Sequence, residues 1–165
     1  MAKTMMRVLL GISILGFGVG AQAAEITPVV ESDYGFQIET VYYDQWTDLT
    51  WQRCSVGQRW VYESGCVGSV KTFTFSDAQH LNRGTWRVPT KDELATLIDY
   101  RRRAQVDKPT INEARFPDMD IGKLVYWSST TAGAADGWGV YFDAGYPGNY
   151  NRSNTYAVRL VRSGQ

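Results

Sequence analysis

The 165-residue sequence has one histidine, two cysteines and no excess of charge of either sign. Its 17 Lys and Arg residues balance its 17 Asp and Glu residues, so no basic excess is present to displace counterions from a nucleic acid. One histidine and two cysteines are too few for a typical zinc site. We therefore expect no nucleic-acid partner and no metal or other cofactor.

Aromatic and apolar residues, by contrast, are abundant. Hydrophobic residues make up 44% of the chain and aromatic residues 13%, which is too apolar for a disordered polymer. The length fits one domain with a core of its own. The sequence therefore predicts a folded domain, although composition alone names no activity.

The first 23 residues have the pattern of a signal peptide. Lys3 and Arg7 precede an uninterrupted apolar, Gly and Ser run at residues 8–20, and Ala21-Gln22-Ala23 supplies the small residues of a cleavage site. The run is shorter than the about 20 residues that a membrane-spanning helix needs. No cysteine follows it to carry a lipid. We expect an exported domain, periplasmic or extracellular, that does not span the membrane after cleavage.

Export would place Cys54 and Cys66 in an oxidising compartment. Their spacing is far from the C-x-x-C pattern of redox-active pairs, and the glycines and aromatics between them suggest a hairpin. We therefore predict a disulfide that closes a short loop and contributes about 3 kcal/mol.

Capping patterns predict two helices. Ser76 with Gln79 and Thr90 with Glu93 both fit a capping box, and the second is followed by the apolar residues Leu94, Leu97 and Ile98 at helical spacing. The run Arg101-Arg102-Arg103 would fall in the last turn of the second helix, opposite the negative end of its dipole.

Residues 24–40 suggest an extended arm, and residues 41–164 suggest the folded domain. Within this domain, strands are predicted mainly in the second half. Alternating patterns predict strands at residues 124–130, 137–143 and 156–162, with a turn-rich loop at residues 144–155. Two helices with antiparallel strands in a single domain give an α+β fold class.

Five segments stand in an order that identifies a family resemblance. They are Asp48-Leu49-Thr50-Trp51, Trp86-Arg87-Val88-Pro89-Thr90, Ile111-Asn112 with Phe116-Pro117, Tyr126-Trp127-Ser128-Ser129-Thr130, and Val158-Arg159-Leu160-Val161-Arg162. Together they resemble the C-terminal domain family of the Legionella collagen-like protein (Lcl). The resemblance covers residues 41–164 and implies a C-type-lectin-like α+β fold in an exported bacterial protein.

The same resemblance implies adhesion, since the best-known member binds sulfated glycosaminoglycans. This chain lacks the collagen-like Gly-x-y repeat that accompanies the domain there, and it lacks the Trp-Asn-Asp triplet of calcium-dependent lectins. Formylglycine-generating enzymes share the fold and use cysteines in catalysis, but both cysteines here are expected to form the disulfide.

The loop at residues 144–155 is the preferred ligand site. It combines flat rings with amide and guanidinium groups suited to a sugar and its acidic substituents, at Tyr146, Asn149, Tyr150, Asn151, Arg152 and Asn154. A solvated loop whose Gly and Asn residues serve turn geometry remains an equal alternative.

The sequence thus predicts a non-enzymatic binding or adhesion domain for a glycan, a polysaccharide or a surface protein. Two alternatives stay open: a hydrolase or modifying enzyme that uses carboxylates and His80, and an assembly subunit that pairs through exposed strand edges. Calcium could be held by Asp118 and Asp120 with Asp77 or Asp92, but no EF-hand loop is present.

Overall fold

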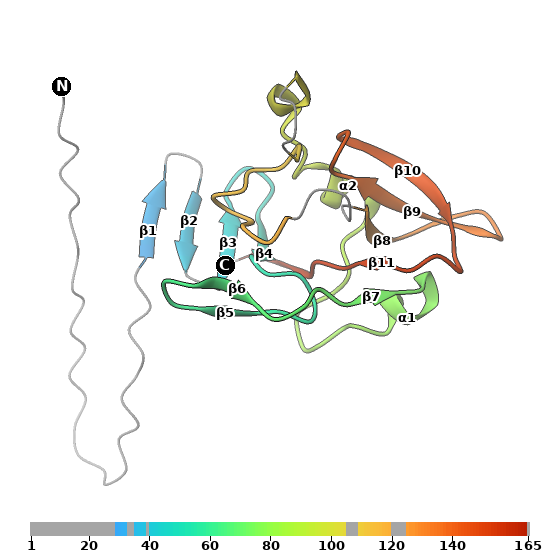
Figure 1. The fold of residues 1–165 in the computed structure, drawn as a ribbon, viewed down its shortest axis with the longest axis horizontal. Helices are drawn as coiled ribbons and strands as arrows, with labels where there is room; N and C mark the ends of the chain where they lie inside the picture. The colour runs from blue at the N-terminus through green and yellow to red at the C-terminus, as the bar shows by residue number, and fades with distance from the viewer. Residues whose placement is uncertain (1–28, 33–34, 39, 105–108, 120–124, 165) are drawn as a thin grey trace, which may run out of the picture.

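A computed structural model describes residues 29–32, 35–38, 40–104, 109–119 and 125–164. Two five-stranded sheets form its framework (Figure 1). The first has the order β1 (Val29–Ser32), β2 (Gly35–Ile38), β3 (Val41–Asp44), β4 (Leu49–Gln52) and β12 (Val161–Ser163). The second has the order β10 (Tyr146–Asn151), β9 (Asp136–Tyr141), β8 (Val125–Ala132), β11 (Tyr156–Ala157) and β7 (Thr72–Phe73).

Short elements complete the fold. A separate hairpin consists of β5 (Arg59–Val61) and β6 (Gly65–Val67), and the helices are α1 (Phe75–Gln79), α2 (Lys91–Ala95) and a 3-10 helix at Tyr100–Ala104. All strand pairs are antiparallel except β11 with β8. The predicted α+β class, with two α-helices and mostly antiparallel strands, is confirmed. The predicted signal peptide lies outside the described residues.

The central strand of the second sheet, β8, is buried on both of its faces. Neighbouring residues of β8 point to opposite sides, so Tyr126 lies in one apolar cluster with Val140 and Phe142, while Trp127 lies in the other with Phe75. Both side chains are at most 2% exposed. This double burial explains why β8 lacks a simple alternation of apolar and polar residues.

The two helix starts differ in how well the sequence predicts them. Thr90 and Glu93 form the predicted capping box, and Leu94, Leu97 and Ile98 are buried as expected. The prediction of Ser76 as a cap is wrong, because the oxygen of Thr74 accepts the bond from the Asp77 amide. Starting at Phe75 places that ring in the core, which outweighs the local Ser76 pattern.

The prediction that three arginines end the second helix is also wrong. α2 ends at Ala95, and the arginines lie in the separate 3-10 helix. The Asp99 amide donates to the Thr110 carbonyl at 2.8 Å, and the Asp99 carboxylate accepts from the Arg101 amide at 3.1 Å. These bonds turn the chain before a longer helix can form.

Residues 156–162 do not form the single strand that was predicted. β11 belongs to the second sheet and β12 to the first, and residues 157–161 between them are buried. The carbonyls of Val158 and Leu160 accept bonds from Val56 and Gln52, at 2.9 and 3.0 Å. The segment therefore connects the two sheets through the interior, where both of its sides face protein.

The predicted disulfide is confirmed. Cys54 and Cys66 are bonded, with 5.4 Å between their Cα atoms. Trp60 of β5 pairs across the hairpin with Cys66 of β6. The bond therefore fixes the β5–β6 hairpin to the end of β4, near Cys54.

Gly137 lies directly against the Phe75 ring, and a Cβ atom there would lie 2.1 Å from Cδ2 of Phe75. Gly137→Ala should lower the free energy of unfolding in urea by about 1–3 kcal/mol, the usual cost of overpacking. Phe75→Leu should absorb part of this cost in a double-mutant cycle, since a smaller side chain leaves room for the methyl group. Unchanged unfolding of Gly137→Ala would contradict the close contact.

Candidate functional site

The segment predicted as a loop contains a strand. Residues 146–151 form β10, which pairs antiparallel with β9 and ends the order of the second sheet. The loop prediction was wrong because Pro147, Gly148 and the asparagines resemble turn residues. An edge strand tolerates proline and polar side chains, since one of its edges pairs with no other strand.

The strand separates the six predicted ligand residues. Successive residues of a strand point to opposite faces, so Tyr146 and Tyr150 lie on one face and Asn149 and Asn151 on the other. Asn149 pairs with Trp138 across the strands, whereas Tyr146 pairs with Tyr141. Arg152 and Asn154 follow the strand in the turn that leads to β11. The six residues therefore do not form one patch.

Four tyrosines gather on the face that carries Tyr146 and Tyr150. We call Tyr141, Tyr146, Tyr150 and Tyr156 the tyrosine surface. The rings of Tyr141 and Tyr146 meet edge to face at 5.8 Å, and those of Tyr150 and Tyr156 at 5.1 Å. Tyr146 is 46% exposed, while the other three are half-buried. Tyr141 and Tyr156 were not among the predicted ligand residues, since both lie in segments predicted as strands.

Glycines make room for these rings. A Cβ atom at Gly148 would lie 3.0–3.2 Å from the outer atoms of the Tyr150 ring, and one at Gly139 would lie 3.4 Å from the same ring. The Tyr150 ring therefore lies flat across the two strands. The buried Trp127 indole contacts the Tyr150 ring edge to face, with 6.2 Å between the ring centres. The Tyr156 ring packs on the same indole, with 4.8 Å between the ring centres. The surface thus rests on the buried core.

Two tyrosines of this surface, Tyr141 and Tyr150, have raised pKa values. Burial, with the neighbouring hydroxyls of Tyr146 and Tyr156, raises the pKa of Tyr150 to about 12. The hydroxyl of Tyr141 donates to the Asp143 carboxylate at 2.6 Å, and that bond raises the pKa of Tyr141. The Asn154 amide donates to the Tyr156 hydroxyl at 3.1 Å. The surface therefore offers hydroxyl groups beside flat rings, and those of Tyr141 and Tyr156 are held by hydrogen bonds.

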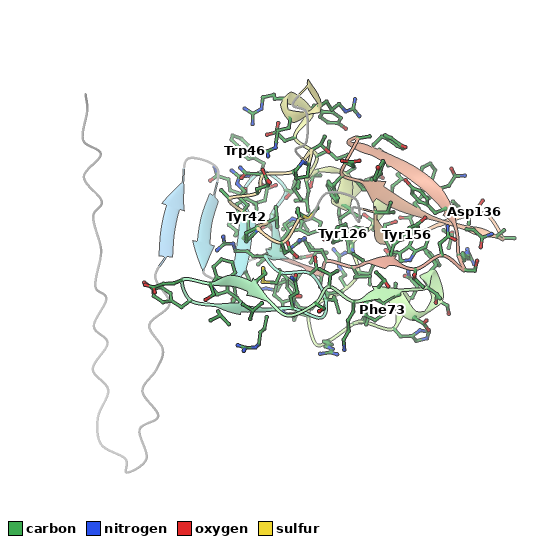
Figure 2. All side chains as sticks on the ribbon, viewed as in Figure 1. Tyr42, Trp46, Phe73, Tyr126, Asp136 and Tyr156 are labelled. Carbon is green, nitrogen blue, oxygen red and sulfur yellow. A yellow bond between two sulfur atoms is a disulfide. The ribbon has the colours of Figure 1, made fainter. Side chains whose placement is uncertain are left out.

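Arg152 has structural contacts. Its guanidinium donates to the carbonyls of Asp136 and Gly133, at 3.0 and 2.9 Å, and lies 5.0 Å from the Phe75 ring centre. These contacts join the turn between β8 and β9 to α1, and Figure 2 labels Asp136 at this end of the second sheet. The expected contact of Arg152 with an acidic ligand group stays a prediction.

A second arginine lies at the opposite end of β10. Arg103 donates to the Gly145 carbonyl, next to Tyr146, and its guanidinium lies 4.7 Å from the centre of the Tyr100 ring. Tyr100 is 58% exposed. Arg101 nearby pairs with Asp99 at 3.0 Å. The 3-10 helix therefore adds an exposed ring and positive charge beside the tyrosine surface.

The residues considered above for catalysis or for calcium binding, His80 and the aspartates, do not lie together at the tyrosine surface. His80 is exposed, and its Nδ1 lies 2.8 Å from the Ser76 carbonyl at the end of α1. Asp118 is paired with Arg159, Asp77 accepts a bond from Thr74, and Asp120 lies outside the described residues. In the part of the chain that the structure describes, no group of three or more His, Cys, Asp and Glu side chains could hold a metal ion.

None of the described helices has the length and apolar character needed to cross a membrane.

Comparison with known proteins identifies a family. No curated protein matches the chain in sequence. A family model described as the Lcl C-terminal domain matches residues 40–162, which include the two helices, the disulfide and most of the described strands. The match agrees with the resemblance carried by the five sequence segments and covers most of the chain. The chain therefore belongs to the Lcl C-terminal domain family.

Proposed function

We propose that this chain is an exported, non-enzymatic binding domain with a C-type-lectin-like fold. In this proposal the tyrosine surface recognises a surface glycan or polysaccharide. The signal-peptide pattern of residues 1–23 supports export, and the Cys54–Cys66 disulfide suits an oxidising compartment. Family membership supports a related role in adhesion.

The observation that carries the proposal is the set of four tyrosine rings on one sheet face. Sugars present apolar C–H faces and hydroxyl groups, so they need flat apolar rings with polar groups at their edges. Tyr146 and Tyr150 supply the rings, and their hydroxyls can donate or accept hydrogen bonds. Because Trp127 and the strand glycines fix the Tyr150 ring, that side chain loses little conformational entropy on binding.

The neighbouring arginines adapt this surface to anionic sugars. Arg103 lies beside Tyr146 through its bond to Gly145, and Arg101 is mostly exposed. A sulfate or carboxylate on a bound glycan would meet this charge, and its contribution would fall as salt rises.

Tyr146→Ala tests the proposal. A glycan array first identifies a ligand of the wild-type protein, and calorimetry then measures its affinity for each variant. Tyr146→Ala should weaken binding about tenfold, equivalent to about 1.4 kcal/mol, because the most exposed ring of the surface is lost. Tyr146→Phe should keep most of the affinity if stacking dominates.

Tyr62→Ala is the matched control, because Tyr62 is 63% exposed and lies in the turn of the separate β5–β6 hairpin. The affinity of Tyr62→Ala for the glycan should equal that of the wild type. Equal losses in Tyr62→Ala and Tyr146→Ala would reject the tyrosine surface as the site. Folded wild-type protein that binds no glycan on a diverse array would reject glycan recognition.

A further inference from the structure

The strand β10 ends the order of the second sheet, so its outer edge pairs with no other described strand. The register of β10 with β9 shows which backbone groups lie on that edge. The Arg152 amide donates to the carbonyl of Ala135, its partner across the two chains, at 3.0 Å. Bonded and non-bonded pairs alternate in an antiparallel ladder. The outward N–H and C=O groups therefore belong to Pro147, Asn149 and Asn151.

Two of these outward groups are not available for pairing. Proline has no backbone N–H, and the Asn151 carbonyl accepts from the Asn154 amide at 3.0 Å. The Pro147 carbonyl, both backbone groups of Asn149 and the Asn151 N–H are left. No hydrogen bond between described residues uses them, and Asn149 and Asn151 are exposed.

The remaining groups are complementary to those of a second copy of the strand. If two β10 strands pair antiparallel with Asn149 opposite Asn149 of the partner subunit, these two residues exchange two backbone bonds. Each Asn151 N–H then meets the partner's Pro147 carbonyl. The proline without an N–H lies opposite the carbonyl that is already bonded within its own chain. This register therefore leaves no backbone group unpaired.

An unrelated strand would fit this edge less well. It would present a carbonyl to Pro147, which has no N–H, and an N–H to the Asn151 carbonyl, which is already bonded. Unpaired backbone groups at an interface are costly. The pattern of missing groups thus favours a second copy of this chain over another extended peptide.

The side chains of β10 also permit the pairing. None of its residues is charged, whereas exposed edge strands are commonly protected by charged side chains. The register places the partner's Gly148 opposite Tyr150, so no side chain lies against that ring from across the edge. Neither charge nor bulk therefore opposes the contact.

We propose that this chain forms a twofold symmetric dimer through β10. Figure 1 shows β10 at the outer edge of the second sheet, where a second copy extends that sheet. Because both subunits use the same edge, the assembly closes at two copies. Residues paired across the edge point to the same face, so the two tyrosine surfaces lie side by side. Under the proposed function, on which this step rests, one polysaccharide would contact both surfaces and bind more tightly.

Sedimentation equilibrium tests the dimer. The mass of the wild-type protein should rise from that of one chain to that of two as the concentration approaches about 1 mM, since the interface of one strand pair is small. Asn149→Pro removes the donors of both central bonds and should weaken dimerisation at least about tenfold. Asn149→Ser keeps the backbone groups and should dimerise like the wild type. A wild-type protein that stays monomeric throughout would overturn the proposal.

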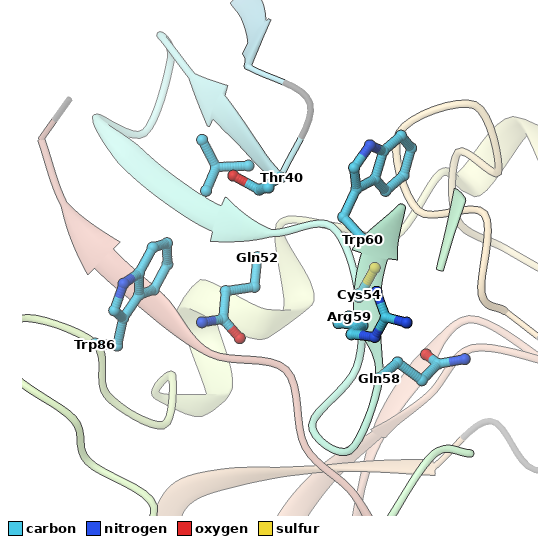
Figure 3. A pocket seen from close by; sticks show the side chains of 8 residues that line it. Thr40, Gln52, Cys54, Gln58, Arg59, Trp60 and Trp86 are labelled. Carbon is cyan, nitrogen blue, oxygen red and sulfur yellow. The ribbon is translucent and has the colours of Figure 1, made fainter. Parts of the chain in front are cut away.

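Asn149→Glu gives the same test if Asn149→Pro fails to fold, because it places two carboxylates opposite each other. Arg59→Glu is its matched control, at an exposed residue on the wall of a cavity. None of the residues that line this cavity belongs to the second sheet; Figure 3 shows Trp60 and Trp86 on opposite sides of it. Arg59→Glu should leave the dimer intact. A dimer lost in Arg59→Glu and kept in Asn149→Glu would place the contact at the cavity and reject β10.

Cysteine cross-linking tests the register. Asn149→Cys should form a disulfide between subunits in oxidised glutathione, because Cα atoms of a bonded antiparallel pair lie about 5.5 Å apart. Asn151→Cys is the matched control: it lies on the same edge, but about 13 Å from its own copy, too far for a disulfide. Cross-linking of Asn149→Cys should be at least about tenfold faster than that of Asn151→Cys. Equal rates would contradict the register.

Tyr146→Ala separates this proposal from glycan binding. It should lose glycan affinity and still dimerise, because the β10 backbone is unchanged. A wild-type dimer that binds no glycan would support the pairing and reject the proposed function. A glycan-binding wild-type monomer would do the reverse.

Discussion

Arg159→Ala should lower the free energy of unfolding by about 3–5 kcal/mol, the range for breaking a buried ion pair. Arg159 and Asp118 are 1% and 0% exposed at their side chains, and their charged atoms lie 2.5 Å apart. Removing the arginine leaves a carboxylate in the interior with no opposite charge. For a domain with a total stability of about 5–15 kcal/mol, this is a large fraction.

The arginine also satisfies backbone groups of another segment. It donates to the carbonyls of Gln52 and Arg53, at 2.8 and 2.5 Å, where β4 ends. Asp118 accepts from the Ser55 amide at 2.6 Å. The pair thus joins the turn before β8, the end of β4 and the segment that connects the two sheets. Its loss should therefore be felt in both sheets.

Thermal unfolding followed by circular dichroism measures the effect, with an expected fall in Tm of about 10 °C. Asp118→Asn should show a comparable loss, because it leaves a buried guanidinium uncompensated. Arg101→Ala is the matched control: its pair with Asp99 is exposed at the arginine, and exposed pairs contribute about 0–1 kcal/mol. A loss for Arg159→Ala as small as for Arg101→Ala would contradict a structural role for the buried pair.

A double variant separates charge from hydrogen bonding. Arg159→Met with Asp118→Leu removes both charges, which for many buried pairs is neutral or stabilising. Here the carbonyls of Gln52 and Arg53 and the Ser55 amide would each lose a partner. Because unpaired buried polar groups cost about 1–3 kcal/mol, the double variant should remain less stable than the wild type.

Sequence reasoning succeeded where local chemistry decides the structure. The Thr90 capping box needs only residues 90–93, and the two cysteines had only each other as partners. Neither depends on distant contacts, so both could be predicted from residue types and spacing. The same is true of the strand pattern within β9.

It failed where tertiary packing decides. Residues 157–161 are buried on all sides because they pass between two sheets, so their alternation suggested one strand where two exist. Gly148 favoured a turn prediction, but it lies in β10, where its lack of a side chain leaves room for the Tyr150 ring. The tyrosine surface could therefore not be predicted without the strand register, which places Tyr141 next to Tyr146.

Trp127→Ala should cost about 3–5 kcal/mol of unfolding free energy, the usual range for large aromatic residues in a core. Trp127 is fully buried, and its indole N–H donates to the Phe73 carbonyl of β7 at 2.8 Å. Its ring also meets Phe75 at 5.3 Å, edge to face. One side chain thus joins β7, α1 and the support of the tyrosine surface.

Urea denaturation followed by tryptophan fluorescence tests this, with Trp46→Ala as the matched control. Trp46 is 76% exposed in the turn between β3 and β4, over the first sheet (Figure 2), so its removal should stay within about 0.5 kcal/mol. Trp127→Phe should cost less unfolding free energy than Trp127→Ala, because a ring remains, although the Phe73 carbonyl loses its donor.

Trp127→Phe should also weaken glycan binding, since Tyr150 and Tyr156 rest on the indole. Glycan affinity unchanged in a destabilised Trp127→Phe would mean that the core fixes the fold but does not position the tyrosine rings.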